Sequence, residues 1–325
     1  MSEHTGTPPI GPADVAAAAE RIAGRTRPVV LAPADPGSVP PGGAQVTFAL
    51  EYLQHTGSFK ARGAANLAAA LQRAGTLPKA GVAIASGGNA GLACAWAARA
   101  TGTLATVFVP RTAPAVKVAK LRGYGAEVRQ VGAEYAEALD ASRAFAAESG
   151  AFLSHAYDHP LIAAGAGTVA TEILAAAARP VDTVVLAVGG GGLFSGVAAA
   201  LAGSGIRTVA VEPEHCRALD AALAAGGPVD VPVESVAADA LGARRASRMA
   251  YELGRNEQTV SVLVTDEAIV QARRSLWEDY RIAVEHGGAA AWAAVRSGAY
   301  KPHEDEHVVV VLCGANTDPT DLGVR

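Results

Sequence analysis

A lysine stands in a distinctive run of small and polar residues, Gln54 to Ala64 (QHTGSFKARGA), between a β-branched stretch and an alanine-rich one. These flanks predict a strand before the run and a helix after it. Lys60 therefore lies at a strand-to-helix turn next to Phe59, where partial burial lowers the pKa of an amine and makes it a nucleophile. Most lysines are solvated surface charges, so it is the surrounding run that points to chemistry.

Four consecutive glycines, Gly189 to Gly192, follow the apolar run VDTVVLAV and precede an expected helix that begins with Leu193. Such a turn lets backbone N–H groups converge on an anion at the positive end of a helix. A dinucleotide site is disfavoured, because Phe194 or Ser195 falls where the last glycine of G-x-G-x-x-G belongs. The turn predicts a site for a single phosphate. A flexible turn is the alternative, although four glycines are entropically costly to order.

A second small-residue loop, SGGNAG, starts at Ser86 and again separates an expected strand from an expected helix. The Ser86 hydroxyl, the Asn89 side chain and the amides of Gly87, Gly88 and Ala90 are suited to hold a carboxylate at a helix N-terminus. Serine and asparagine are also ordinary helix N-caps, so this loop alone does not define a site.

The last apolar run ends in Cys313, within LCGAN. A thiol there offers one weak hydrogen bond, and a buried inert cysteine is the alternative interpretation. Together the four features provide an amine, a phosphate anchor, a carboxylate cradle and a weak neutral partner. All are expected at strand ends, where open α/β sheets bind ligands.

The elements that position these residues alternate along the chain in a βαβ rhythm. Apolar runs without alternation, typical of buried parallel strands, recur between alanine-rich helical stretches. We predict an α/β fold with two open, mostly parallel sheets flanked by helices. The first part of a large domain is expected at 1–80, an inserted small domain at 81–159, and the second part of the large domain at 160–325.

Composition limits the class of function. The 325 residues are 50% hydrophobic with a formal charge of −4, which excludes disorder and disfavours a nucleic-acid partner. Three cysteines without paired spacing indicate a reduced compartment. No cationic leader and no uninterrupted apolar span is found, so we expect a cytoplasmic protein without a membrane partner that acts on a small molecule.

In these motifs the chain resembles the fold type II pyridoxal-phosphate enzymes, whose architecture is like that of the tryptophan synthase β subunit. The resemblance is to the serine/threonine dehydratase (ammonia-lyase) family. It rests on TGSFKARGA, SGGNAG, GGGGL, VEPE and LCGAN, which follow one another in family order from about residue 45 to 316. It implies that pyridoxal 5'-phosphate is the cofactor.

The resemblance also implies a role for each motif. Lys60 would carry the cofactor covalently and act as the catalytic base, with Phe59 against the cofactor ring and Asn89 on its hydroxyl. The backbone from Gly189 to Leu193 would bind the phosphate, and Cys313 would face the ring nitrogen. The substrate carboxylate would be held by Ser86, Gly87, Gly88, Asn89 and Ala90.

A neutral thiol at Cys313 cannot hold a proton on the ring nitrogen as a carboxylate would, so the cofactor is a weaker electron sink. That favours prompt loss of a β-hydroxyl, and we expect β-elimination of water from L-threonine or L-serine to give a 2-oxo acid and ammonia. Alternatives within enzymes are a lyase on another β-hydroxy amino acid such as a hydroxyaspartate, a serine racemase, or a cysteine-synthase-type enzyme. A catalytically silent binder of amino acid or cofactor is the non-enzyme alternative.

Four further expectations come from the resemblance. Racemases of the family carry serine where Gly87 stands, so little racemisation is expected. Glu212 and the Cys216 carbonyl match a monovalent or divalent cation site of some relatives, although Ala218 stands where a further oxygen ligand is sometimes found. Glu285 resembles an acidic residue near the cofactor, with helix capping as the alternative. Family members usually form dimers, so a homodimer is expected.

Overall fold

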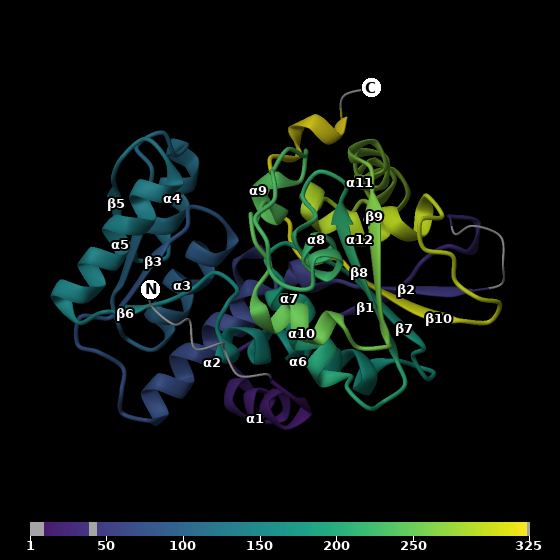
Figure 1. The fold of residues 1–325 in the computed structure, drawn as a ribbon, viewed down its shortest axis with the longest axis horizontal. Coiled ribbons are helices and arrows are strands. Elements are labelled where there is room, and N and C mark those ends of the chain that lie inside the picture. Colours follow the sequence, from purple (N-terminus) through teal and green to yellow (C-terminus); the bar gives the residue numbers. More distant parts are fainter. Residues whose placement is uncertain (1–9, 39–43, 324–325) are drawn as a thin grey trace.

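The computed structural model describes residues 10–38 and 44–323, which form two separate β-sheets with helices around them (Figure 1). The larger sheet has six strands in the order β1-β2-β10-β7-β8-β9, and the smaller has four in the order β5-β4-β3-β6. All neighbouring strands run parallel except β1, which pairs with β2 in antiparallel orientation. The predicted α/β class is thus confirmed.

The strands of the large sheet come from both ends of the chain. They are β1 (Leu31–Pro33), β2 (Gln45–Ala49), β7 (Thr183–Ala187), β8 (Arg207–Pro213), β9 (Thr259–Val264) and β10 (His307–Val311). The valine-rich strands β7 and β10 are buried along their whole length, because helices cover both faces of a parallel sheet. Strand β9 has a similar composition but forms the sheet edge and is only half-buried.

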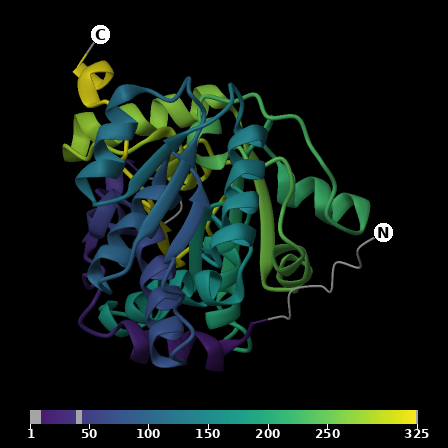
Figure 2. The same cartoon turned by 90° about the vertical axis from the view of Figure 1, so that its left-hand side faces the viewer.

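The small sheet is made by β3 (Val82–Ala85), β4 (Ala105–Val109), β5 (Glu127–Gln130) and β6 (Phe152–Leu153). Helices α3 (Asn89–Ala100) and α4 (Ala115–Gly123) share a core with Val82, Ile84 and Val107. Helix α5 (Tyr135–Ser149) packs against Ala83 and Phe108, whose side chains leave the other face. Figure 2 shows this layered unit from its own side.

The remaining helices surround the large sheet. They are α1 (Pro12–Ile22), α2 (Lys60–Arg73), α6 (Pro160–Ala176), α7 (Gly192–Ala200), α8 (Ala218–Ala225), α9 (Ala238–Leu241), α10 (Arg248–Gly254), α11 (Asp266–Tyr280) and α12 (His286–Arg296). Helix α6 packs against α1, α2 and α7, while α12 packs against α11 and the central strands.

A buried ion cluster fixes the start of helix α2. The guanidinium of Arg62 is fully buried and donates to both carboxylate oxygens of Glu51, at 2.5 and 3.0 Å, and to Glu172 on α6 at 2.6 and 2.9 Å. Two carboxylates and the planar guanidinium thus satisfy one another's hydrogen-bonding groups. Because Arg62 follows Lys60 by two residues, this cluster anchors the turn that carries the lysine.

Strand β6 is short, because only Phe152–Leu153 pairs with β3 before the chain turns away. The boundaries at 80/81 and 159/160 stay a prediction. Among the residues that the structure describes, no helix is both long and apolar enough to cross a membrane. Cys94, Cys216 and Cys313 are buried and unpaired.

Candidate active site

Lys60 lies at the first position of helix α2. Its Nζ donates to the carbonyl oxygen of Ala156 at 2.7 Å and lies 5.0 Å from the centre of the Phe59 ring. Burial lowers the pKa of Lys60 to about 8, although the nearby Cys313 and Glu285 act in the opposite direction. At pH 7 roughly one tenth of this amine is therefore neutral, and the neutral form is the nucleophile.

A short backbone pairing brings Lys60 next to the end of strand β10. Ser58 forms an isolated antiparallel bridge with Gly314, and the Phe59 amide donates to the Cys313 carbonyl at 3.0 Å. The buried Cys313 thiol makes only a long contact of 3.7 Å, to the carbonyl of Gly287. Burial raises the pKa of the Cys313 thiol to about 12, so it stays neutral. The predicted neutral partner is thus beside the predicted nucleophile.

The glycine turn, Gly189 to Gly192, leads directly from strand β7 into helix α7. Gly191 is the N-cap residue with φ +96°, and no side chain caps the helix. A Cβ at Gly190 would lie 2.3 Å from the Tyr157 ring, and one at Gly191 would lie 2.3 Å from the Ala250 Cβ. Only glycines fit this turn. The first N–H groups of α7 have no partner within the helix, which is the arrangement that binds a phosphate.

The 86–91 loop, Ser86 to Gly91, faces the same region from the small domain. It leads from β3 into α3, with Gly88 as the N-cap residue and no side-chain cap. The Gly88 amide approaches the Ser86 hydroxyl at 3.4 Å. A Cβ at Gly91 would lie 1.9 Å from the Ser86 carbonyl, so the loop closes tightly on itself. Ser86, Gly87, Gly88, Asn89 and Ala90 are half-buried at the start of the helix, as expected for an anion cradle.

Asn89 joins the two domains through its side chain. Its amide donates to Oε1 of Glu285 at 2.7 Å, and its Oδ1 accepts from Asn316 at 2.7 Å. Glu285 is the N-cap residue of α12, but its side chain makes no capping hydrogen bond to that helix. Burial raises the pKa of Glu285 to about 7.

Two buried hydroxyls next to Lys60 have no hydrogen-bond partner among the described residues. They belong to Thr56 and Ser58, which are at most 8% exposed. A buried hydroxyl without a partner is energetically costly, and a bound polar ligand relieves that cost. These hydroxyls, the neutral amine and the uncapped helix fit a phosphorylated aldehyde cofactor.

At the expected cation site, backbone amides donate hydrogen bonds to Glu212. Both oxygens of the fully buried Glu212 carboxylate accept hydrogen bonds of 2.8 Å, from the amides of Leu219 and Asp220 in the first turn of α8. Ala218 supplies no side-chain oxygen. Within residues 10–38 and 44–323, no group of three potential metal-binding side chains is found. The arrangement around Glu212 and Cys216 is therefore that of a carboxylate bound to a helix N-terminus and does not fit a side-chain cation site.

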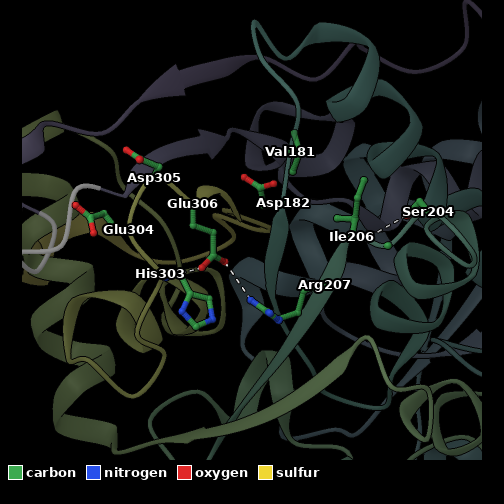
Figure 3. Close-up of a pocket in the computed structure, with 10 residues that line it drawn as sticks. Val181, Asp182, Ser204, Ile206, Arg207, His303, Glu304, Asp305 and Glu306 are labelled. Atoms are coloured by element: carbon green, nitrogen blue, oxygen red, sulfur yellow. Dashed lines mark hydrogen bonds and ion pairs between the residues drawn. The ribbon is translucent and has the colours of Figure 1, made fainter.

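A separate cavity of about 500 Å³ opens at the N-terminal ends of the large-sheet strands, where β7, β8 and β10 begin (Figure 3). The glycine turn and Cys313 instead follow the C-terminal ends of β7 and β10. The cavity wall includes Arg207 and Glu306, and Glu306 accepts from Thr183 at 2.5 Å and from the His303 amide at 2.6 Å. None of the sequence-predicted site residues lines it.

Fold and site together define an α/β enzyme, and comparison with known proteins gives its family. Residues 25–314 match the family described as "Pyridoxal-phosphate dependent enzyme". The chain belongs to this family. Pyridoxal phosphate is its cofactor, as predicted.

Two named relatives are similar to this chain over most of its length. The chain is 34% identical over 285 residues to a serine dehydratase-like protein of Mus musculus, covering 84% of this chain and 86% of the relative. It is 37% identical over 285 residues to phenylserine dehydratase of Ralstonia pickettii, covering 86% and 85%.

Two solved structures are similar throughout. Maize serine racemase superposes with a TM-score of 0.88 at 30% identity, covering 96% of this chain and 95% of that one. A threonine deaminase from T.th. gives a TM-score of 0.86 at 33% identity, covering 95% and 99%.

Sequence reasoning missed two contacts that shape the site. Tyr157 lies on the glycine turn and donates its hydroxyl to the Arg245 carbonyl at 3.2 Å. The carbonyl of Ala156 accepts from Lys60. A backbone carbonyl carries no residue-specific signal, but an aromatic residue three positions before the start of helix α6 was visible in the sequence.

Proposed function

We propose that this chain catalyses β-elimination of water from L-serine or L-threonine, followed by release of a 2-oxo acid and ammonia. The observation that carries the proposal is the position of Lys60. Its amine, with a pKa of about 8, donates to the carbonyl of Ala156, and the next residue, Tyr157, packs on the glycine turn. The strand-end segment beside Lys60, at Gly314, lies close to the Asn89 side chain of the other loop. Relatives named as dehydratases and a deaminase support the same reaction.

In this proposal the large domain holds the cofactor. Lys60 would carry it covalently, the backbone from Gly189 to Leu193 would bind its phosphate, and Phe59 would lie against its ring. Cys313 would hold the ring nitrogen and Asn89 the ring hydroxyl. Pyridoxal phosphate, when bound, supplies an electron sink for the α-carbon of an amino acid.

The small domain orients the substrate. Ser86 and the loop amides bind its carboxylate, which places the α-carbon within reach of Lys60. Lys60 would accept the α-proton of the substrate, since its lowered pKa leaves the amine partly neutral.

The neutral Cys313 thiol favours elimination over transamination. It has no negative charge that would retain a proton on the nitrogen of a bound pyridoxal phosphate, so the cofactor would be a weaker electron sink and prompt loss of the β-hydroxyl would be favoured. Gly87 has no side chain to move a proton on the opposite face of the substrate. We therefore propose little racemisation, although a serine racemase has the same fold.

A substrate panel tests the proposal. The purified holoenzyme is incubated with L-serine, L-threonine, phenylserine and hydroxyaspartate, and 2-oxo acid and ammonia are measured in equal amounts. Turnover of L-serine or L-threonine supports the proposal. Sulfide-dependent formation of cysteine without release of ammonia would favour a synthase, and no turnover of any amino acid would favour a silent binder.

We further propose a homodimer that acts in the reducing cytoplasm. The three buried and unpaired cysteines support a reducing compartment. The dimer is supported by the resemblance, because family members usually form dimers. Light scattering coupled to size exclusion tests the second point, and a mass near 33 kDa, that of one 32.7 kDa chain, would contradict it.

A further inference from the structure

An ion pair crosses from the small domain to the large one. Nζ of Lys117 on α4 lies 2.6 Å from Oδ1 of Asp239 on α9. The Lys117 side chain is 34% exposed and that of Asp239 is 67% exposed, so the pair lies at the surface. Figure 1 shows α9 on the side of the large domain that faces the small one. Neither residue belongs to the site described above.

On the small-domain side, Lys117 is coupled to the 86–91 loop through its own helix. Leu121 lies one turn further along α4 and is fully buried. A Cβ at Gly91 would lie 3.3 Å from the Leu121 side chain, so α4 packs directly behind the loop. A displacement of α4 therefore moves the expected carboxylate cradle, because close-packed side chains transmit such shifts.

On the large-domain side, Asp239 belongs to the helix that backs the glycine turn. A Cβ at Gly189 would lie 3.1 Å from Leu241 and 3.3 Å from the Ala240 carbonyl. Ala240 also approaches Gly287, at the start of α12. Helix α9 thus touches both the expected phosphate site and the segment that follows Glu285.

The pair is also electrically close to the site. Lys117 lowers the pKa of Glu285 and Asp239 raises it, beside the larger effect of burial. Both charges therefore lie near the carboxylate that bonds Asn89.

We infer that Lys117 and Asp239 are positioning residues for the reaction: their ion pair holds the 86–91 loop closed against the cofactor half of the site. The inference rests on the proposed function only in taking the 86–91 loop as the substrate cradle. Neither residue touches substrate. The pair opens for substrate to enter and re-forms to hold the bound carboxylate in place.

Charge removal tests this inference. Asp239→Asn and Lys117→Gln should each raise KM about two- to fivefold, the range of an exposed ion pair, with kcat changed less than about twofold. The double variant Lys117→Gln/Asp239→Asn should be no worse than either single one, because both remove the same interaction. The swapped pair Lys117→Asp/Asp239→Lys should restore most of the wild-type KM.

The matched control is Glu127→Gln. Glu127 forms an ion pair of 2.7 Å with Arg129 and is 58% exposed, but both partners lie on β5 of the small domain. We expect its KM to equal that of the wild type. Effects that add in the double variant, or a KM for Asp239→Asn equal to that of the control, would overturn the inference.

A second readout does not depend on turnover. Amide hydrogen exchange in peptides that cover 86–91 and 238–242 of the holoenzyme should be about two- to fivefold faster in Asp239→Asn than in wild type. Unchanged exchange would overturn the inference. Faster exchange in a protein that processes no amino acid would keep the positioning role and defeat the proposed function instead.

Discussion

The side-chain amide of Asn89 donates to Oε1 of Glu285 over 2.7 Å, and this bond links the start of helix α3 to the residue that precedes helix α12. Glu285 is 8% exposed, and burial raises the pKa of its carboxyl from 4.5 to about 7. The folded protein therefore holds a proton on Glu285 at pH values where the unfolded chain has lost it.

This shift gives stability a defined pH dependence. Between pH 4.5 and about 7 the folded state binds more protons than the unfolded state, so the contribution of Glu285 to stability falls as the pH rises. Because of Glu285, the free energy of unfolding of the wild type should fall by up to about 3 kcal/mol across this window, and Glu285→Gln should remove that fall. Denaturant unfolding of the cofactor-free protein at several pH values measures it. Parallel pH profiles for wild type and variant would contradict the assignment.

Substitutions at Cys313 test whether elimination requires a neutral side chain at this position. Cys313→Ser keeps a neutral group and should lower kcat for elimination by less than about tenfold, under about 1.4 kcal/mol of barrier. Cys313→Asp places a carboxylate there and should slow elimination by more than about 100-fold while raising transamination with added 2-oxo acids. Steady-state assays of both products measure the ratio. Wild-type elimination by the aspartate variant would refute the role of the neutral thiol.

Gly87 offers room for a second proton-transfer group. A Cβ at this position meets only Val109 Cγ1, at 3.4 Å, which is an ordinary contact. Gly87→Ser should therefore fold normally and form D-serine from L-serine at least about tenfold faster than wild type. Chiral chromatography of the reaction mixture measures this rate. Equal D-serine formation in both proteins would show that the residue at 87 does not control the second face.

Much of this arrangement is readable from the sequence, because it depends on local patterns. Valine runs predicted β7 and β10, and glycine-rich turns predicted the two helix N-termini. Strand β9 shares that composition yet forms a half-buried edge, since composition does not encode which strands become neighbours. Strand β1 is three residues long with a proline, too short for a periodic signal. The pairing of Ser58 with Gly314 joins distant segments and follows only from the folded chain.

We expect the thermal stability of this chain not to depend on a cation, in contrast to relatives that bind one. Both Glu212 oxygens are already bonded to backbone amides. Removing cations with a chelator, or adding Mg²⁺ or K⁺, should shift the melting temperature by less than about 1 °C, because no binding energy is gained. Glu212→Gln should lower it, since one oxygen acceptor is lost in a buried site. A rise of several degrees with either cation would show that the amides yield to a metal.

The attachment point of the cofactor tests the central claim most directly. The holoenzyme is reduced with borohydride, digested, and the peptides are analysed by mass spectrometry, with Lys60→Ala as the comparison. Cofactor mass on Lys60 alone, with loss of both visible absorbance and turnover in the variant, is the predicted result. Cofactor found on another lysine, or a Lys60→Ala protein that still releases ammonia at the wild-type rate, would contradict the account.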